Sequence, residues 1–335
     1  SIAVHHIHSF ATRSIISISN PTKEISHADV QRLLEEARRI AIPSDRRILH
    51  VIPQDYIIDG QDGITDPIGM SGVRMEANVH IVTALVTAMQ NIHRCVERAG
   101  LTVSDLVLEP LASSAAVLDE DEKEVGVALI DIGGGTTDVA VFHEGIIRHT
   151  AVFAIAGHQV TDDICNVLGI LNVQAERIKR EYGHALQESI MRDEVFMIPG
   201  IGGRKPLEVT KSLLCQVIQP RMEEIFEFAY AEIKKSGYAD RLFAGVIVTG
   251  GSALLRGTDE LAHNVFGRPV KIGIPSAMTY GGLAPEVESP MFATAVGLVM
   301  YGLRARNTII EESTEDVATK KPSLFRKVKS FFEDL

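Results

Sequence analysis

Residues 129–138 constrain the fold of this chain more than any other segment. They read Leu-Ile-Asp-Ile-Gly-Gly-Gly-Thr-Thr-Asp, so an apolar strand delivers a carboxylate, three glycines and two hydroxyls to one sharp turn. Glycines lack a Cβ, which lets backbone N–H groups approach a phosphate closely, and the threonines add hydroxyl donors. The segment predicts a phosphate-binding turn in which Asp131 holds a hydrated Mg²⁺. The candidate residues are Asp131, Gly133, Gly134, Gly135, Thr136 and Thr137.

The residues after the turn decide which kind of phosphate loop this is. Residues 139–142 read as a second strand, and residues 143–145, His-Glu-Gly, as a tight reversal. The glycines therefore lie in a hairpin and do not precede a helix, which excludes a Walker loop and a Rossmann turn. A plain connection between two strands is the alternative. An Asp before three glycines and Thr-Thr-Asp after them favour nucleotide binding.

This hairpin resembles the second phosphate loop of the actin-like ATPase superfamily, which includes actin, sugar kinases, chaperone ATPases and bacterial MreB and FtsA. Residues 246–257 resemble its adenosine motif, a β-branched strand followed by Gly250, Gly251 and Ser252 and a helix start. The resemblance implies that the Gly-Gly backbone lies flat against a nucleoside. It also implies ATP and Mg²⁺ as cofactors.

A third segment agrees with this resemblance. Glu176 and Lys179 are three residues apart, on one face of a predicted helix. They resemble the pair that flanks the ribose and base in MreB-like and chaperone relatives. Alone, such a pair is more typical of a surface salt bridge. The resemblance implies an α/β, actin-like ATPase fold of two lobes, with parallel and mixed sheets flanked by helices and a first lobe that is incomplete at its amino terminus.

Length and composition are compatible with this fold. The chain has 335 residues, of which 45% are hydrophobic, enough to bury a large core. Its three cysteines are far apart and lack metal-ligand spacing, which favours a reducing compartment. No apolar run reaches the roughly twenty residues of a membrane span, and the start does not resemble a signal peptide. The net charge of −11 argues against a nucleic-acid-binding surface.

The carboxy-terminal residues 320–335 depart from this acidic pattern. Wound as a helix, their apolar residues fall within an arc of roughly 120°, opposite the charges. An acidic stretch, residues 307–319, precedes them like a flexible linker. Docking on the protein's own core is the alternative, but the segment favours the interface of an anionic bilayer. The candidate membrane-binding residues are Leu324, Phe325, Arg326, Lys327, Val328, Lys329, Phe331, Phe332 and Leu335.

The phosphate hairpin and this tail together resemble the FtsA family, and residues 47–56, 67–75 and 199–206 resemble it specifically. The resemblance implies a cell division protein that assembles into actin-like filaments and tethers the FtsZ ring to the membrane. Its implied partners are FtsZ, further copies of itself, anionic lipids and later division proteins, with no nucleic acid. Its implied location is peripheral, on the cytoplasmic face of the bacterial inner membrane at the division site. Arg268 and Lys271 fall in a region that in the family lies near the surface receiving the FtsZ tail.

The resemblance also predicts the organisation of the chain. Residues 1–84 form a relocated first-lobe subdomain for self-assembly and partner contact, and residues 85–123 the remainder of that lobe, with a strand over 103–108 and a crossing helix. Residues 124–160 and 241–290 form the nucleotide core of the second lobe, and residues 161–240 its smaller subdomain. Residues 291–306 form a second crossing helix, 307–319 a linker and 320–335 the membrane-targeting helix.

One superfamily feature is missing, the first phosphate loop, Asp-x-Gly-Thr or Asp-x-Gly-Ser. Residues 1–128 do not supply it, because Asp59-Gly60 and Asp62-Gly63 are turn signals without suitable flanking strands. We therefore expect an amino-terminal truncation and weak ATP binding, or none, which the missing segment would restore. Glu109, before Pro110, matches the residue that positions the attacking water in MreB-like relatives, so a slow ATPase is possible. A carboxylate that only favours the helix start is the equal alternative.

Two other classes of function fit the fold. One is a soluble enzyme, either a sugar kinase or a chaperone-type ATPase, and the other is a pilus-assembly or shape-determining actin relative. A kinase would show a substrate-binding acid and a catalytic Asp in the first lobe, and it has no need of a cationic amphipathic tail. Residues 67–75 and 199–206 favour the FtsA family over the pilus and shape-determining relatives.

Overall fold

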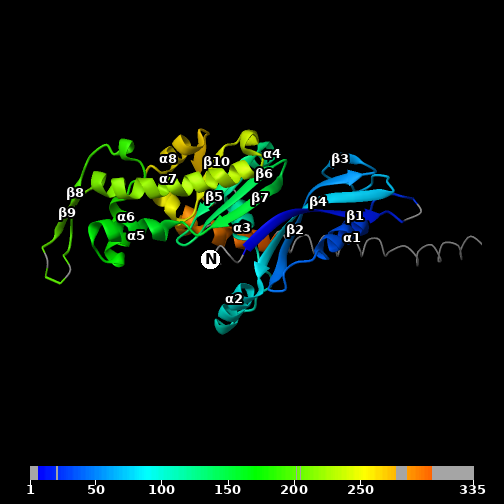
Figure 1. The fold of residues 1–335 in the computed structure, drawn as a ribbon, viewed down its shortest axis with the longest axis horizontal. Helices are drawn as coiled ribbons and strands as arrows, with labels where there is room; N and C mark the ends of the chain where they lie inside the picture. Colours follow the sequence, from blue (N-terminus) through cyan, green and yellow to red (C-terminus); the bar gives the residue numbers. More distant parts are fainter. Residues whose placement is uncertain (1–6, 20–21, 201, 204, 277–284, 304–335) are drawn as a thin grey trace, which may run out of the picture.

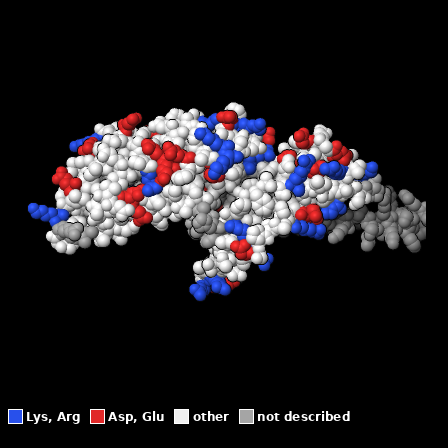
Figure 2. Space-filling model, in the orientation of Figure 1, with Lys and Arg blue, Asp and Glu red and all other residues white. Residues whose placement is uncertain are grey.

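The computed structural model describes residues 7–19, 22–200, 202–203, 205–276 and 285–303. They form an elongated molecule in which a four-stranded sheet and a five-stranded sheet lie side by side (Figure 1). Acidic and basic side chains are interspersed over the face displayed in Figure 2. The predicted tail, residues 320–335, lies outside the described residues, as does the linker over 307–319.

The four-stranded sheet is antiparallel, in the order β1-β4-β2-β3. One helix, α1, crosses it and buries Leu33 and Ala37 against it. The sequence predicts a helix over Ser26 to Ile40, opened by Ser26 and Asp29, and these two residues form a capping box at the start of α1. The elements are β1 (Ile7–Ser17), α1 (His27–Arg38), β2 (Arg46–Ile58), β3 (Gln61–Ile64) and β4 (Arg74–Leu85).

The five-stranded sheet has the order β11-β10-β5-β6-β7. Strand β10 runs parallel to both β5 and β11, whereas β5, β6 and β7 form an antiparallel meander. The glycine-rich turn joins β5 to β6, so the predicted hairpin is confirmed. The strands are β5 (Val127–Ile132), β6 (Thr137–His143), β7 (Ile146–Phe153), β10 (Val246–Thr249) and β11 (Val270–Ile272).

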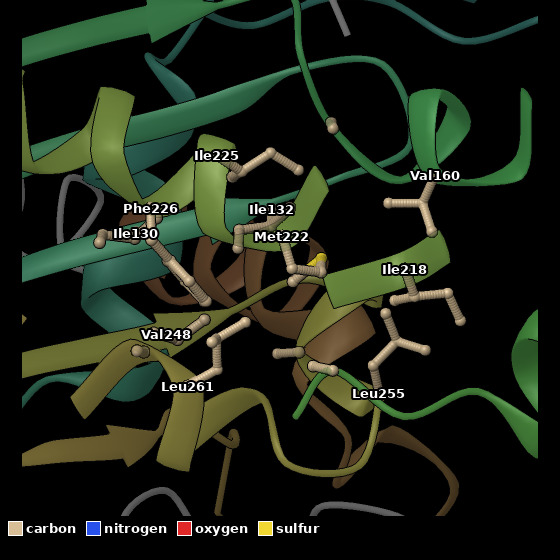
Figure 3. Close-up of a cluster of buried hydrophobic side chains, with 14 of the residues drawn as sticks. Ile130, Ile132, Val160, Ile218, Met222, Ile225, Phe226, Val248, Leu255 and Leu261 are labelled. Atoms are coloured by element: carbon tan, nitrogen blue, oxygen red, sulfur yellow. The ribbon is translucent and has the colours of Figure 1, made fainter. Parts of the chain in front are cut away.

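Helices cover both faces of this sheet because successive side chains of its strands point to opposite faces. Ile130, Ile132 and Val248 face α7 (Lys211–Lys235) and pack against its Met222 and Phe226 (Figure 3). On the other face, Leu129 and Ile247 pack with α3 (Glu109–Val117) and with a helical segment over 293–303. These two helices lie in the regions for which the sequence predicts crossing helices.

These two crossing helices lie unusually close together. A Cβ added to Gly297 would lie 1.8 Å from the Ala112 carbonyl oxygen, so only glycine fits at this contact. The remaining helices are α2 (Val86–Arg98), α4 (Glu120–Val125), α5 (Gly157–Leu168), α6 (Asn172–Tyr182) and α8 (Thr258–Phe266). The remaining strands are β8 (Val195–Ile198) and β9 (Leu207–Thr210), and short 3₁₀ turns cover Gln187–Ser189, Ala239–Arg241, Gly251–Leu254, Pro285–Val287 and Pro290–Phe292.

Two local predictions for the first half of the chain were wrong. Residues 103–108 do not form a strand, because no strand of the described part of the chain lies beside them; the Leu108 N–H donates to His50 Nε2 instead (2.9 Å). Strands β2 and β3 do flank Asp59-Gly60. The Asp59 carboxylate accepts hydrogen bonds from the Val73 and Arg74 backbone, so it joins two turns of this sheet.

Candidate functional site

Three segments far apart in sequence meet at the glycine-rich turn. The Gly133 carbonyl accepts hydrogen bonds from the Gly157 N–H (3.0 Å) and the Ser252 hydroxyl (3.3 Å). The Gly134 carbonyl accepts one from the His158 N–H (2.7 Å). The predicted phosphate turn and the predicted adenosine segment are therefore in direct contact, joined by the start of α5.

A cleft of about 360 Å³ opens beside this junction. Gly133 and Gly134 line it together with Gly251 and Ser252 from the turn after β10. A Cβ on Gly251 would meet nothing within 4 Å, so its backbone borders open space. The cleft has flat, Cβ-free backbone on one side and side chains of α6 on the other, which fits a planar ligand. The other lining residues are Gly157, His158, Glu176, Lys179, Arg180, Gly183, Leu254, Leu255, Arg256 and Met291.

Glu176 and Lys179 both line this cleft and form an ion pair (Oε2 to Nζ, 2.6 Å). The Lys179 ammonium also donates to the Gly157 carbonyl (2.9 Å) and the Thr161 hydroxyl (2.8 Å), while Thr161 donates to Glu176 (2.6 Å). Burial alone would raise the pKa of Glu176, but hydrogen bonds from Lys179 and Thr161 lower it below its usual value. The pair thus fastens α6 to the start of α5.

Asp131 is the penultimate residue of β5, just before the glycines, and is almost completely buried. The Thr294 hydroxyl donates to its Oδ2 (3.2 Å) and lies 3.5 Å from Glu109 Oε1. Burial, and then the nearby Glu109 charge, raise the pKa of Asp131 to about 7. Burial and the charges of Glu109 and Asp131 also hold the pKa of Asp138 well above its usual range. Carboxylates crowded in this way favour a nearby cation.

Among the described residues, no group of three or more His, Cys, Asp or Glu side chains is arranged to hold a metal ion directly. A magnesium ion that keeps most of its waters needs only one or two protein carboxylates, with phosphate oxygens completing its shell. Asp131 fits that requirement, since its carboxylate lies at the base of the glycine turn and its neighbours are negatively charged. The donor set is therefore compatible with a hydrated Mg²⁺ accompanied by phosphates.

The backbone of Gly250 is set by this arrangement. It has φ +87° and ψ 174°, a region essentially restricted to glycine. A Cβ there would lie 2.5 Å from both Asp131 Oδ1 and the Ile132 carbonyl oxygen. Gly250 thus allows the ends of β5 and β10 to meet, whereas Gly251 faces the cleft.

The two threonines differ from the expectation of free donors. The Thr137 hydroxyl donates to the Ile155 carbonyl (2.7 Å), and the Thr136 hydroxyl bonds the Asp138 side chain. Both side chains are buried. Their hydroxyls therefore fix the hairpin to its surroundings in this structure.

The other predicted residues lie away from the cleft. Glu109 begins α3 and shares Thr294 with Asp131, behind the glycine turn. Arg268 lies 3.6 Å from the Asp240 carboxylate, and Lys271 pairs with Glu122 at 2.6 Å. Arg268 lies just before β11 and Lys271 lies within it, and each already has an acidic partner.

Sequence reasoning missed the residues that connect the site. Thr161 and His158 belong to α5, and Ser113 and Thr294 belong to the two crossing helices. No spacing pattern marks them, because they reach the site from three elements that are far apart in sequence. The small residues Ala112 and Gly297 were the available signal, since small residues permit such close helix contacts.

Two family models match the chain. The model "Cell division protein FtsA" matches residues 128–297, and "SHS2 domain inserted in FTSA" matches residues 4–83. The first match contains the glycine turn, the ion pair of α6 and the turn after β10. The second match covers the four-stranded sheet with α1.

Solved structures of low sequence identity show the fold alone. The chain aligns with MreB 5 of Spiroplasma citri bound to AMPPNP with a TM-score of 0.57 and 19% identity, over 68% of each chain. It aligns with a chain of the PilM-PilN type IV pilus biogenesis complex with a TM-score of 0.57 and 17% identity, over 89% of this chain and 76% of the other. The fold is therefore actin-like, as predicted.

Curated relatives are much closer in sequence. Cell division protein FtsA of Pseudomonas aeruginosa is 47% identical over 306 residues, 91% of this chain and 72% of the relative. The Escherichia coli K12 protein of the same name is 39% identical over 316 residues, 92% of this chain and 75% of the relative. By its sequence, its two family matches and its fold, this chain belongs to the FtsA family of cell division proteins.

Proposed function

We propose that this chain acts as an actin-like division adaptor, which binds ATP with Mg²⁺, assembles into filaments and connects FtsZ to the membrane. The observation that carries the nucleotide part is the meeting of residues 133–134, 157–158 and 250–252 at one cleft. The structure of an MreB of the same fold bound to AMPPNP supports nucleotide binding as a function for this fold.

Each part of the cleft has a proposed task. The backbone of Gly133–Gly135 borders the phosphates, and Asp131 holds the hydrated Mg²⁺, which would neutralise phosphate charge. The Gly251 backbone lies against the nucleoside, and the Glu176–Lys179 pair lies at the ribose and base. Because the Lys179 ammonium already makes three contacts, it keeps α5 and α6 in place for the ligand rather than following it.

ATP serves mainly as a structural cofactor in this proposal. Glu109 is the candidate for positioning water, but it shares a hydroxyl donor with Asp131 and does not line the cleft. Slow turnover at most is expected from that arrangement. The ligand instead joins the segments that surround the cleft, and so favours one conformation for filament assembly.

The nucleotide test is a titration of the chain with a fluorescent ATP analogue in the presence of Mg²⁺. We expect weak binding, because the sequence contains one phosphate hairpin of the superfamily type. Gly251→Val should abolish it by filling the open space against the nucleoside. Gly302→Val is the matched control, since Gly302 also borders open space but is absent from the lining of the cleft. Equal affinity of all three proteins would refute the proposed site.

The membrane part rests on the sequence of residues 320–335. Among the described residues, no helix combines the length and apolar composition needed to cross a membrane. Co-sedimentation with anionic liposomes would test the tail, with Phe331→Glu/Phe332→Glu as the variant. Binding that is lost in the variant is expected, and equal pelleting of both proteins would contradict the anchor.

The FtsZ contact remains a separate proposal at Arg268 and Lys271. Both residues have acidic partners, Asp240 and Glu122, which an acidic tail would have to displace. Arg268→Glu/Lys271→Glu should therefore weaken binding of FtsZ in a pull-down without changing liposome binding. Unchanged FtsZ binding would remove these two residues from the proposal.

A further inference from the structure

Strand β1 is an outer strand of the four-stranded sheet, because only β4 pairs with it. It is eleven residues long and follows the border of the sheet beside α1 (Figure 1). An outer strand presents a row of N–H and C=O groups that can pair with another extended chain.

The register shows which groups point outward. Ser17 pairs with Arg74, and the next residue, Ile18, donates its N–H to the Val73 carbonyl (2.8 Å). In an antiparallel ladder the residues alternate between facing the partner strand and facing away. The even-numbered residues of β1 therefore face β4, and the backbones of Ala11, Arg13 and Ile15 face outward.

Contacts with other elements limit this outward row at both ends. Near one end the Ser9 hydroxyl donates to the Thr150 carbonyl of β7 (3.0 Å). At the other end Arg32 donates to the Ser17 carbonyl (2.8 Å). Between them Ala11, Arg13 and Ile15 are exposed, with Ile15 at 49%. Within the described part of the chain, neither the strand ladder nor a side-chain hydrogen bond provides a partner for their outward backbone groups.

The side chains beside this edge carry an unbalanced positive charge. The Arg13 and Arg74 guanidinium groups each lie 2.6 Å from one oxygen of the same carboxylate, that of Glu76. The Glu76 side chain is 4% exposed, whereas those of Arg13 and Arg74 are 51% and 57% exposed. Two cations therefore share one buried anion, and their outer sides remain accessible.

This charge argues against pairing of β1 with β1 of a second copy. A symmetric antiparallel pair centred on Ala11 or Thr12 needs Ser9, which lies against β7. One centred on Ser14 or Ile15 needs the Ser17 carbonyl, which Arg32 occupies. The remaining pair, centred on Arg13, places two arginines directly opposite each other. Like charges in that position are destabilising.

We propose that the outward edge of residues 11–15 is a strand-addition site for an extended partner peptide with an acidic residue opposite Arg13. Main-chain hydrogen bonds to Ala11, Arg13 and Ile15 would hold such a peptide, and its carboxylate would balance the second guanidinium. This site lies outside the nucleotide cleft and outside the proposed tail, so it adds a partner surface that the adaptor proposal does not contain.

Hydrogen exchange at single-residue resolution tests the proposal on the unmodified chain. The probe is the synthetic peptide acetyl-Thr-Val-Thr-Glu-Thr-Val-Thr-amide, and the control peptide has Lys in place of Glu. With the Glu peptide at ten times its Kd, the amides of Ala11, Arg13 and Ile15 should exchange about ten-fold more slowly. The amides of Thr12 and Ser14 should not change, because they already pair with β4.

Two variants at one position separate strand addition from other contacts. Ala11→Pro removes only an outward N–H, which an edge strand tolerates, and should weaken Glu-peptide binding; Ala11→Val keeps the N–H and should not. Equal binding of the Lys peptide, or no slowing at Ala11, Arg13 and Ile15, would overturn the proposal. Slowing that rises with protein concentration without peptide would overturn it in favour of a second copy. Nucleotide titration and liposome sedimentation do not involve this edge, so its failure would leave the proposed function standing.

Discussion

Adding a single methyl group at Gly250 tests how the ends of β5 and β10 are held together. In Gly250→Ala the new Cβ would lie 2.5 Å from both Asp131 Oδ1 and the Ile132 carbonyl oxygen. Those two atoms belong to the strand end that carries the glycine turn. The alanine would also have to adopt φ +87° and ψ 174°.

The expected destabilisation follows from these two effects. Forcing a non-glycine residue into that backbone region costs about 1–3 kcal/mol. Overpacking a site with backbone on one side adds about 1–3 kcal/mol. We therefore expect Gly250→Ala to lower the free energy of unfolding by about 2–6 kcal/mol. The neighbouring Gly251→Ala should change it by less than about 0.5 kcal/mol, because its Cβ would meet nothing within 4 Å.

Urea unfolding of the three proteins, followed by circular dichroism, measures this difference. Nucleotide titration of the same samples provides the second reading, because Gly251 lines the cleft and Gly250 does not. The main effect of Gly250→Ala should therefore be a lower free energy of unfolding. Gly251→Ala should bind nucleotide more weakly while its free energy of unfolding stays unchanged. Equal stability of Gly250→Ala and wild type would refute the claim that β5 and β10 meet only because position 250 has no side chain.

Three further outcomes are expected. Because the pKa of Asp131 is raised to about 7, the folded protein binds more protons than the unfolded chain between pH 4 and 7. Its stability relative to Asp131→Asn should thus fall by up to about 4 kcal/mol over that range in unfolding titrations; a constant difference would contradict the raised pKa. Gly297→Ala should destabilise the protein by about 1–3 kcal/mol, since its Cβ would lie 1.8 Å from the Ala112 carbonyl; thermal melting with Gly302→Ala as control checks this, and matching melting temperatures would count against it. Finally, phosphate release should be slow, and fast turnover that Glu109→Ala abolishes would argue against a structural role for ATP.

Much of the local structure followed from short patterns. The run over residues 129–145 predicted a strand, a glycine turn and a second strand, and β5 and β6 have that form. Ser26 and Asp29 predicted the start of α1 through their capping chemistry. These predictions succeeded because a cap or a hairpin depends on residues within a few positions of one another.

Predictions that depended on a distant partner were less successful. The apolar residues 103–108 have strand-like composition but no adjacent strand in the described part of the chain. Thr137 was expected to offer its hydroxyl to a ligand, but Ile155, eighteen residues away, accepts its hydrogen bond. In both cases the residue types are compatible with the predicted role. The segment packed beside them determines whether a strand ladder forms and which group accepts the hydroxyl proton.

The sequence by itself determined the actin-like fold, the FtsA family and the position of the glycine turns, because each can be recognised from motifs of consecutive residues. Only the tertiary structure decided which side chains meet at the site. Thr294 reaches Asp131 across 163 residues, and Ser252 reaches Gly133 across 119. Such contacts exist because two crossing helices and two strand ends pack without space for a Cβ at Gly297 and Gly250. Close packing of distant backbones is a property of the folded chain, and no local spacing of residues encodes it.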